Sequence, residues 1–583
     1  MIRLSSHSIV SSLIILLLYA CGPSKPASTQ VSTSSAIPMI SFPSPRTTIT
    51  ASASRVIPSR TPALESSSTA TITSSATRPV PSATSTLEPT PTLPLPAEGP
   101  YFAFWDGNLT LIGADNVGRK EIPLPAEARA GDCFACMISP DGRWLAYWTG
   151  FAGEVSYTSL PDPNGQYDLP LNLLHIPDGT TEMITNLLSP DYPANFQKNA
   201  QTIKKLPEFS EESVDGLAVM LYTSFISGIE SAAWSPDSRF LAFAGEEDGP
   251  SSDLYVYDAV TKSILRLSDG SENIAWIKWS PDGKWIVYSS TYWVGEGTTV
   301  SLYAARPDDS QSRDFNVDVS GGFEGWVSPS VFLTIENGNG TGRYDLRKIT
   351  IETGGASAIW QCEIDSYGYD PEQGSYLVQS YTTSLLENCQ YDGLYFGIPS
   401  STPARLLSLD SDGFPRIGFL GQGSRRFLIQ TDSGAFVVSS TGKITSIGQA
   451  GFSSSISPDR QWVAFARKGL HLMDASGKIS ELLNDVEVFN VSWQPNSKGL
   501  FYTSGLNLFS ISLPDGKIKQ IEEPYRISNP DPRNIYWQPD SQGCFFASLD
   551  GLFFLSLPGQ SATFIQDIGS PDSFDPAWVA VPK

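Results

Sequence analysis

The sequence predicts an all-β protein built as a β-propeller, and three observations lead to this fold class. First, a pattern of an apolar run, a turn and a second apolar run recurs along residues 98–583. Second, most copies lie about 35 to 50 residues apart, a spacing that suits a four-stranded propeller blade. Third, the repeats begin with strands that lack a first partner, and the chain ends with a strand that has no successor. A closed ring of sheets explains all three.

The clearest copy of the repeat is SENIAWIKWSPDGKWIVYSS, at residues 271–290. Its second apolar run, Trp285 to Tyr288, consists of aromatic and β-branched residues that suit a pleated sheet. Between the two runs, Pro281, Asp282 and Gly283 have the conformational preferences of successive positions in a tight turn. The segment therefore predicts a β-hairpin.

Other copies of this unit differ in how much of the turn they keep, and the one near residue 419 has lost its proline. They begin at Ile138, Trp234, Val327, Tyr369, Phe419, Ile456, Trp493 and Trp537. The tryptophans just before the turns are predicted to be buried blade residues. Large aromatic side chains in that place are expected to pack against an adjacent blade.

Counting the turns that end each unit gives about ten repeats. The turns outnumber the motifs by one, because residues 101–123 have the later strands of a blade but no first strand. Residues 575–581, DPAWVAV, have the pattern of that missing strand. A blade shared between the two chain ends would close the ring and remove its exposed edges. We expect about ten four-stranded blades in one ring; two smaller propellers are the alternative.

The N-terminal region has a different composition from the repeats. Residues 1–20 contain the apolar run Leu13 to Leu18, which is short for a membrane span and fits a signal peptide. Leu18-Tyr19-Ala20-Cys21 resembles the lipobox of bacterial lipoproteins, which implies acylation of Cys21. An ordinary secretory signal or an uncleaved anchor are the alternatives. The predicted location is extracytoplasmic, with a lipid anchor in the bacterial cell membrane or envelope.

Residues 21–97 are mostly Ser, Thr, Pro and Ala. Such a segment has too little apolar surface to offset the entropy lost on ordering, so a disordered stalk is predicted. Between Pro140 and Pro236 the repeat is interrupted, and residues at about 190–228 have a helical pattern. We expect a partly helical insertion here, which acts as a lid, as a site for a partner, or as a loop without a function of its own.

The unit WSPDGKWIVYS, Trp279 to Ser289, resembles the repeats of TolB-type, WD40-like propellers, and the resemblance extends over residues 100–583. It implies either an envelope binding scaffold or the gating domain of a prolyl oligopeptidase-type enzyme. Such an enzyme also needs a hydrolase domain with a G-x-S-x-G motif and a histidine. No G-x-S-x-G is present, and His175 and His471 are the histidines that remain after the predicted signal.

The cysteines give few indications of chemistry. Cys362 and Cys389 lie near the ends of adjacent predicted strands and are a possible disulfide pair in an exported protein. Cys133 and Cys136 form a C-x-x-C motif on a predicted strand, where residues three apart face opposite ways and cannot bridge without a local turn. A zinc site would need a second such pair. No metal and no cofactor are predicted, and Cys544 is expected to be buried.

The charge of the chain excludes one class of partner. The whole sequence has a net charge of −23, and its first 97 residues contribute +4, which leaves about −27 on the repeats. Without a basic stripe, nucleic-acid binding is not expected. Acidic turns at residues 410–413 and 162–165 lack the complete ligand spacing of a calcium loop.

Two hypotheses of function follow. The favoured one is a lipid-anchored scaffold that binds an envelope or extracellular protein, peptide or glycan without catalysis, through its loops or the insertion at 190–228. No catalytic residue is assigned, because the recognisable patterns build strands and turns. The alternative is a propeller hydrolase or lyase that acts on a glycan with paired carboxylates near the ring axis.

Overall fold

The computed structural model describes residues 99–579 with gaps, of which the longest are 151–167, 195–230, 292–299, 381–390, 408–415 and 522–533. Several predicted features lie outside the described residues: the signal peptide with Cys21, the stalk at 21–97, Cys389, the acidic turns at 162–165 and 410–413, and most of the insertion at 190–228. No helix among the described residues is long and apolar enough to cross a membrane.

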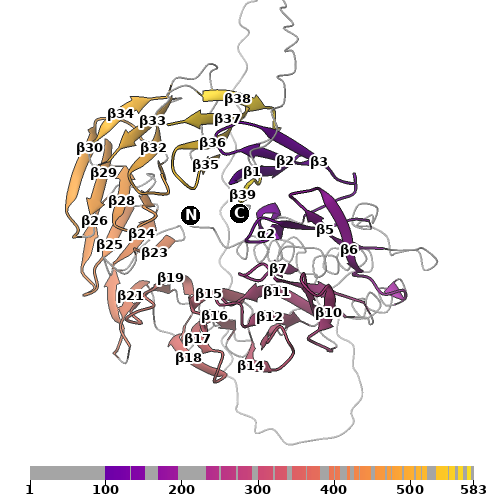
Figure 1. Cartoon of the computed structure of the whole chain (residues 1–583). Helices are drawn as coiled ribbons and strands as arrows, with labels where there is room; N and C mark the ends of the chain where they lie inside the picture. The colour runs from indigo at the N-terminus through magenta and orange to yellow at the C-terminus, as the bar shows by residue number, and fades with distance from the viewer. Residues whose placement is uncertain are drawn as a thin grey trace, which may run out of the picture. The chain divides into compact units, whose positions relative to one another are not determined.

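The strands form ten antiparallel sheets, which confirms the predicted all-β, ten-blade propeller (Figure 1). We number the blades in chain order. The first three comprise β39 (Ala577–Val579) with β1 (Tyr101–Trp105), β2 (Asn108–Gly113) and β3 (Arg119–Pro123); α2 (Phe134–Met137) with β4 (Trp144–Trp148), β5 (Pro170–His175) and β6 (Thr180–Asn186); and β7 (Ala232–Trp234), β8 (Phe240–Gly245), β9 (Asp253–Asp258) and β10 (Ser263–Arg266).

Blades 4 to 7 contain the strands of the middle of the chain. These are β11 (Asn273–Trp279), β12 (Ile286–Thr291), β13 (Val300–Ala305) and β14 (Ser312–Asp318); β15 (Gly322–Ser328), β16 (Val331–Asn337), β17 (Tyr344–Thr350) and β18 (Gly355–Trp360); β19 (Ile364–Tyr369), β20 (Tyr376–Ser380), β21 (Gly393–Gly397) and β22 (Ala404–Leu407); and β23 (Arg416–Phe419), β24 (Phe427–Thr431), β25 (Gly434–Val438) and β26 (Ile444–Ser446).

Blades 8 to 10 complete the series. They comprise β27 (Ser454–Ile456), β28 (Trp462–Ala466), β29 (Gly469–Asp474) and β30 (Ile479–Asn484); β31 (Val491–Trp493), β32 (Gly499–Ser504), β33 (Asn507–Ser512) and β34 (Lys517–Gln520); and β35 (Ile535–Trp537), β36 (Gly543–Ser548), β37 (Gly551–Ser556) and β38 (Ala562–Gln566).

Blade 1 is made from both ends of the described chain, as the sequence predicts. Strand β39 pairs antiparallel with β1, with Trp578 opposite Phe102. The Trp578 ring lies 5.3 Å from that of Phe102 and 5.8 Å from that of Phe545 in blade 10. The closing strand therefore completes one sheet and also packs against the neighbouring blade.

The repeated turn holds each hairpin by side-chain hydrogen bonds. In blade 4, Ser280 Oγ donates to Asp282 Oδ1 at 2.8 Å, and the Trp285 backbone N–H donates to Ser280 Oγ at 3.0 Å. Gly283 has a φ of 69°, which a glycine adopts without steric strain. The serine, aspartate and glycine of the motif are thus explained by turn geometry.

The tryptophan before the turn connects neighbouring blades. Trp279 is 8% exposed, and its indole N–H donates to the Ala233 carbonyl of blade 3 at 2.8 Å. Trp234 makes the same kind of bond to the Met137 carbonyl of blade 2 at 2.9 Å. Trp493 and Trp537 are equally buried. The prediction that these are buried blade residues is confirmed.

The first position of blade 2 departs from the predicted strand. Residues 134–137 form the short helix α2, and Cys133 and Cys136 are joined by a disulfide with their Cα atoms 5.3 Å apart. The prediction that the two cysteines lie on a strand and face opposite ways is wrong. The helical turn brings their side chains to one side, which is the local turn that a bridge between such closely spaced cysteines requires.

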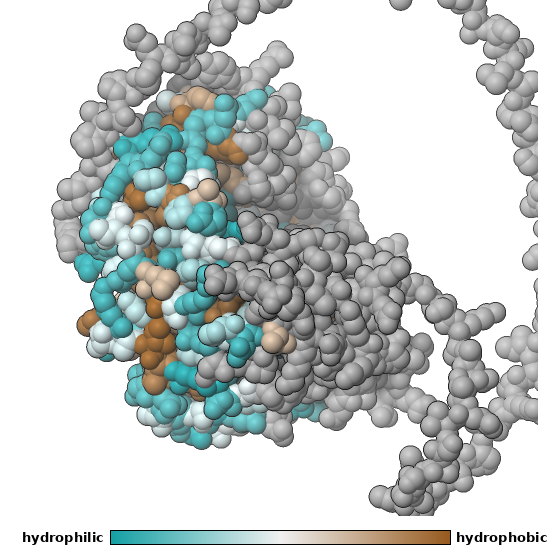
Figure 2. Space-filling view, turned by 90° about the vertical axis from the view of Figure 1, so that its right-hand side faces the viewer, coloured by the Kyte–Doolittle hydropathy of each residue, from teal (hydrophilic) through white to brown (hydrophobic). Residues whose placement is uncertain are grey.

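The outer surface of the described residues is mostly polar. Figure 2 shows one side of the molecule, where hydrophilic residues surround small separate apolar areas. The exposed large apolar side chains include Met183 and Val260, which lie in different blades. Isolated apolar residues of this kind are normal on a soluble surface.

Candidate functional site on the inner strands of blades 4 to 6

Figure 1 shows the labelled first strands, β39, β7, β11, β15, β19, β23 and β35, on the inner side of the ring. Each is an edge of its sheet, and first strands of neighbouring blades contact one another, as β7 does β11, β19 does β23, and β27 does β31. Residues on these strands therefore surround the axis, where propellers commonly present a site. Any candidate site formed by several blades together is expected here.

Three consecutive first strands differ from the others. Strands β11 and β15 have 7 residues and β19 has 6, whereas β7, β27, β31 and β35 have 3 each. All three long strands also contain irregular registers of the β-bulge type. Bulges are frequent beside active sites because they redirect a side chain. Blades 4 to 6 thus share an inner face that the rest of the ring lacks.

Glu324 is the extra residue of one bulge in β15. Phe323 pairs with Thr334 and Gly325 pairs with Leu333, which leaves Glu324 without a partner in the ladder. The hydroxyl of Tyr367, on β19 of the next blade, donates a hydrogen bond to Glu324 Oε2 at 2.9 Å. Both residues are half-buried. The bulge therefore directs a carboxyl group across the junction between blades 5 and 6.

The surroundings of this pair alter its ionisation. Burial raises the pKa of Glu324 to about 7, and the hydrogen bond from Tyr367 partly opposes that increase. Burial and the nearby carboxylate together raise the pKa of Tyr367 well above its ordinary value. A carboxyl group with a pKa near neutrality is able both to accept and to release a proton, as general acid–base catalysis requires.

Half-buried aromatic side chains lie on the same strands. Trp276, in the irregular part of β11, has a φ of 52°, which is rare for a bulky residue. On β15, the rings of Phe323 and Trp326 lie 5.3 Å apart, and the Trp326 ring is 5.6 Å from Phe332. Backbone outliers of this kind concentrate at functional sites. All three also pack against the core between blades 4 and 5, so they have a structural role as well.

The residues singled out in the sequence do not come together at this site. Cys362 is disulfide-bonded, but its predicted partner Cys389 lies outside the described residues, so that pairing stays a prediction. His175 Nδ1 lies 2.9 Å from Asp178 on the hairpin between β5 and β6, and His471 stacks on Phe465 in blade 8. In the part of the chain that the structure describes, no group of three or more His, Cys, Asp or Glu could hold a metal ion.

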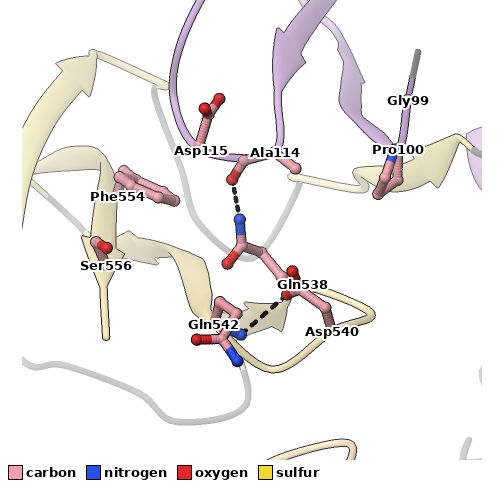
Figure 3. A pocket seen from close by; sticks show the side chains of 9 residues that line it. All are labelled: Gly99, Pro100, Ala114, Asp115, Gln538, Asp540, Gln542, Phe554 and Ser556. Atoms are coloured by element: carbon pink, nitrogen blue, oxygen red, sulfur yellow. Dashed lines mark hydrogen bonds between the residues drawn. The ribbon is translucent and has the colours of Figure 1, made fainter. Parts of the chain in front are cut away.

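A hollow of about 320 Å³ lies at the junction of blades 1 and 10 (Figure 3). The Gln538 amide in it donates to the Ala114 carbonyl, which joins the two blades. Its carboxylates serve local turns: Asp115 accepts from the Val117 N–H at 3.0 Å and Asp540 from the Gln542 N–H at 2.9 Å. Its polar groups are thus explained by ring closure, and the hollow is a weaker candidate than Glu324.

Sequence reasoning missed Glu324 and Tyr367. Both lie in weak copies of the repeat, where the tryptophan and the complete S-P-D-G turn are absent. The available signal was this departure itself: the segment GFEGW at 322–326 places a carboxylate between aromatic residues where other blades have a short apolar strand.

Comparisons with known proteins relate chiefly to the fold. No family model matches the chain. A curated relative, the uncharacterized peptidase YuxL of Bacillus subtilis, is 28% identical over 111 residues, which cover 18% of this chain and 17% of the relative. The match therefore includes less than a fifth of that protein's length.

Three solved structures illustrate the likeness in fold. A eukaryotic initiation factor has a TM-score of 0.41 at 12% identity and covers 83% of this chain and 99% of its own. An oligogalacturonate lyase in complex with manganese has a TM-score of 0.25 at 13% identity. The match covers 56% of this chain and 88% of the lyase. Dipeptidyl peptidase 4 of Porphyromonas gingivalis has a TM-score of 0.37 at 9% identity. The match covers 77% of this chain and 65% of the peptidase.

These comparisons correct the sequence prediction that the chain is not an enzyme. The finding that overturns it is the match to the curated relative, which is named as a peptidase. The prediction rested on missing motifs, namely the nucleophile elbow and a second cysteine pair. Acid–base catalysis by a carboxyl group needs neither of these.

Proposed function

We propose that this protein is a propeller hydrolase or lyase that acts on a glycan, with Glu324 as its general acid–base residue. The observation that carries this proposal is the Glu324–Tyr367 pair: a carboxyl group on a bulged inner strand, hydrogen-bonded by a phenol from the next blade, with a pKa near 7. Cleavage of a glycosidic bond requires a proton at the leaving oxygen, which such a carboxyl group can supply.

A glycan is the proposed substrate because of the neighbouring aromatic residues. Trp276, Phe323 and Trp326 are half-buried on the inner strands, so part of their surface remains available to a ligand. Aromatic rings pack against the apolar faces of ligands, and an indole N–H is able to add a hydrogen bond. In a lyase, Glu324 would remove a proton from the sugar ring while Tyr367 protonates the departing oxygen. In a hydrolase, Glu324 would protonate that oxygen while a second group activates water.

The test is turnover of a panel of neutral and uronic-acid glycans by the full-length protein. We expect Glu324→Gln to lower kcat by about 10²- to 10⁴-fold, the usual contribution of a general acid–base residue. In a hydrolase, Tyr367→Phe should move the activity limb set by Glu324 to higher pH, because the hydrogen bond from Tyr367 lowers the Glu324 pKa in the parent and its loss raises that pKa. In a lyase, the same variant should also lower kcat, because it lacks the proton donor for the departing oxygen. Products with a new double bond indicate a lyase, and products with a new reducing end indicate a hydrolase.

Glu372→Gln is the matched control, because Glu372 is an exposed carboxylate in the turn after the strand of Tyr367. It should retain the activity of the parent. If the panel is not cleaved but peptides are, the glycan assignment is wrong. If Glu324→Gln keeps the parent kcat on any substrate, the assignment of the catalytic group is wrong.

We also propose that the enzyme works outside the cytoplasm on a lipid anchor at Cys21, with residues 21–97 as its spacer. The lipobox-like LYAC sequence and the Ser/Thr/Pro-rich composition support this. A protein or glycan partner that contacts the insertion at 190–228 is part of the same proposal. The negative charge of the repeats is unfavourable for a nucleic-acid partner.

A further inference from the structure

The disulfide of blade 2 occupies an unusual place. Every other blade has a strand at its first position, but blade 2 has the four-residue helix α2 and the Cys133–Cys136 bridge. Cys136 is exposed, whereas Cys133 is half-buried. The Cys136 backbone N–H also donates to the Cys133 carbonyl at 3.0 Å, which makes the same turn without a covalent bond.

Three blades meet at this turn. Helix α2 contacts β39 of blade 1, β4 of blade 2 and β7 of blade 3. The buried Phe134 ring lies 6.2 Å from Trp105 of blade 1, edge to face. The Met137 carbonyl accepts the indole hydrogen bond of Trp234 in blade 3. The covalent state of the bridge therefore bears directly on the junction beside the shared closing blade.

Stability alone explains this bridge poorly. A disulfide reduces the conformational entropy of the unfolded chain least when the loop that it closes is short. Only two residues separate these cysteines, so the expected gain in stability is small. The other blades position their first element by strand pairing and packing. The exposed residue Cys136 also offers a point of attack, since thiol–disulfide exchange requires access of a thiolate to one sulfur.

We propose that Cys133–Cys136 is a thiol–disulfide exchange site that an external dithiol reduces while the propeller stays folded. A thiolate of the dithiol attacks Sγ of the exposed residue Cys136, which forms a mixed disulfide and releases Cys133 as a thiolate. The second thiolate of the reductant then attacks the reductant's other sulfur, which is bonded to Cys136 in the mixed disulfide. This forms a disulfide within the reductant and releases Cys136 as a thiolate. Two electrons pass to the protein, the dithiol becomes a disulfide, and the two cysteine thiolates take up protons from water.

The experiment titrates the full-length protein with dithiothreitol, alkylates free thiols and locates them by mass spectrometry. Cys133 and Cys136 should become labelled together at a dithiol concentration about tenfold or more below that needed for Cys362, with the β-sheet circular dichroism unchanged. Cys544 serves as an internal indicator of unfolding, because it is a fully buried free thiol whose pKa is raised by burial. It should stay unlabelled.

Two single variants test which sulfur is attacked. In Cys133→Ser, the remaining Cys136 should form a mixed disulfide with oxidised glutathione about tenfold faster than Cys133 does in Cys136→Ser, because access limits the reaction. Equal rates, or a faster reaction at Cys133, would overturn the assignment of Cys136 as the attacked sulfur. Labelling of Cys133 and Cys136 only together with Cys544, or at the same dithiol concentration as Cys362, would show a purely structural bridge.

Discussion

Glu324 is a residue whose environment opposes its ionisation. In the unfolded chain its pKa is near 4.5, and in the folded chain burial raises it to about 7. The folded state therefore prefers the protonated carboxyl group. Below about pH 4.5 both states are protonated, and above about pH 7 both are ionised. The free energy of unfolding decreases as the pH rises between these two values, because only the folded state then holds the proton.

Glu324→Gln should remove this pH dependence, since the amide resembles the neutral acid and can still accept the Tyr367 hydrogen bond. Relative to the parent, the variant should gain about 1 to 3 kcal/mol in free energy of unfolding between pH 5 and pH 8, the value of one to two pKa units. Urea titrations at the two pH values measure the difference. Glu372→Gln should follow the parent at both. Parallel curves for parent and Glu324→Gln would contradict a raised pKa.

The repeated residues were predictable for a physical reason that does not apply to Glu324. The turn of blade 4 needs a serine, an aspartate and a glycine at fixed spacing, and the indole of Trp279 needs an acceptor in the previous blade. The same turn and the same indole hydrogen bond occur in other blades, so the residues that form them recur in the sequence. Glu324 acquires its raised pKa from a single bulge and a single neighbour on another blade, and such a contact leaves no periodic pattern.

Among the elements, the closing strand β39 has the widest effect, because it covers the edge of β1. Its three residues pair with Tyr101, Phe102 and Ala103. Without it, the N–H and C=O groups of β1 on that side would lose their partners, and an unpaired edge invites association with other chains. The aromatic contacts of Trp578 with blades 1 and 10 would be lost as well.

A chain that ends at residue 574 should therefore be less stable and should aggregate. Burial of a large aromatic side chain alone contributes roughly 3 to 5 kcal/mol, so a fall in Tm of several degrees is expected. A chain that ends at residue 579 keeps β39 and is the control. Thermal unfolding with light scattering compares the two. Equal melting and equal scattering would mean that β39 does not close the ring.

At the level of elements, the sequence predicts the repeated strands well, but it does not predict that a helix replaces the first strand of blade 2. The shared blade follows from a count of strands, since each chain end lacks what the other provides. Helix α2 does not, because Phe134 to Met137 has too few residues to show a helical period, and the apolar residues around it resemble a strand. The disulfide between Cys133 and Cys136 spans a turn that the local pattern does not indicate.

Across the whole molecule, the regular features of the repeat are unevenly distributed round the ring. Blades 2 to 4 and 8 to 10 are joined by the indole hydrogen bonds of Trp234, Trp279, Trp493 and Trp537. Blades 5 and 6 have no such tryptophan, and their long, bulged inner strands contain Glu324 and Tyr367. A regular scaffold thus holds an irregular segment, which is the usual division between structure and site.

The proposed activity on extracellular glycans requires export of the protein, and the N-terminal sequence predicts both export and retention at the membrane. The apolar run ends at Ala20-Cys21, directly before the Ser/Thr/Pro-rich segment. We expect cells that express the full chain to incorporate labelled fatty acid into it, and Cys21→Ser to lose that label and to leave the membrane fraction. The propeller itself should be unaffected, because Cys21 is far in sequence from the first blade.

Cys544→Ser, which changes a buried cysteine, is the control and should keep both the lipid label and the membrane association. Unchanged lipid label in Cys21→Ser would exclude acylation at this cysteine, and membrane retention without label would favour an uncleaved signal as the anchor.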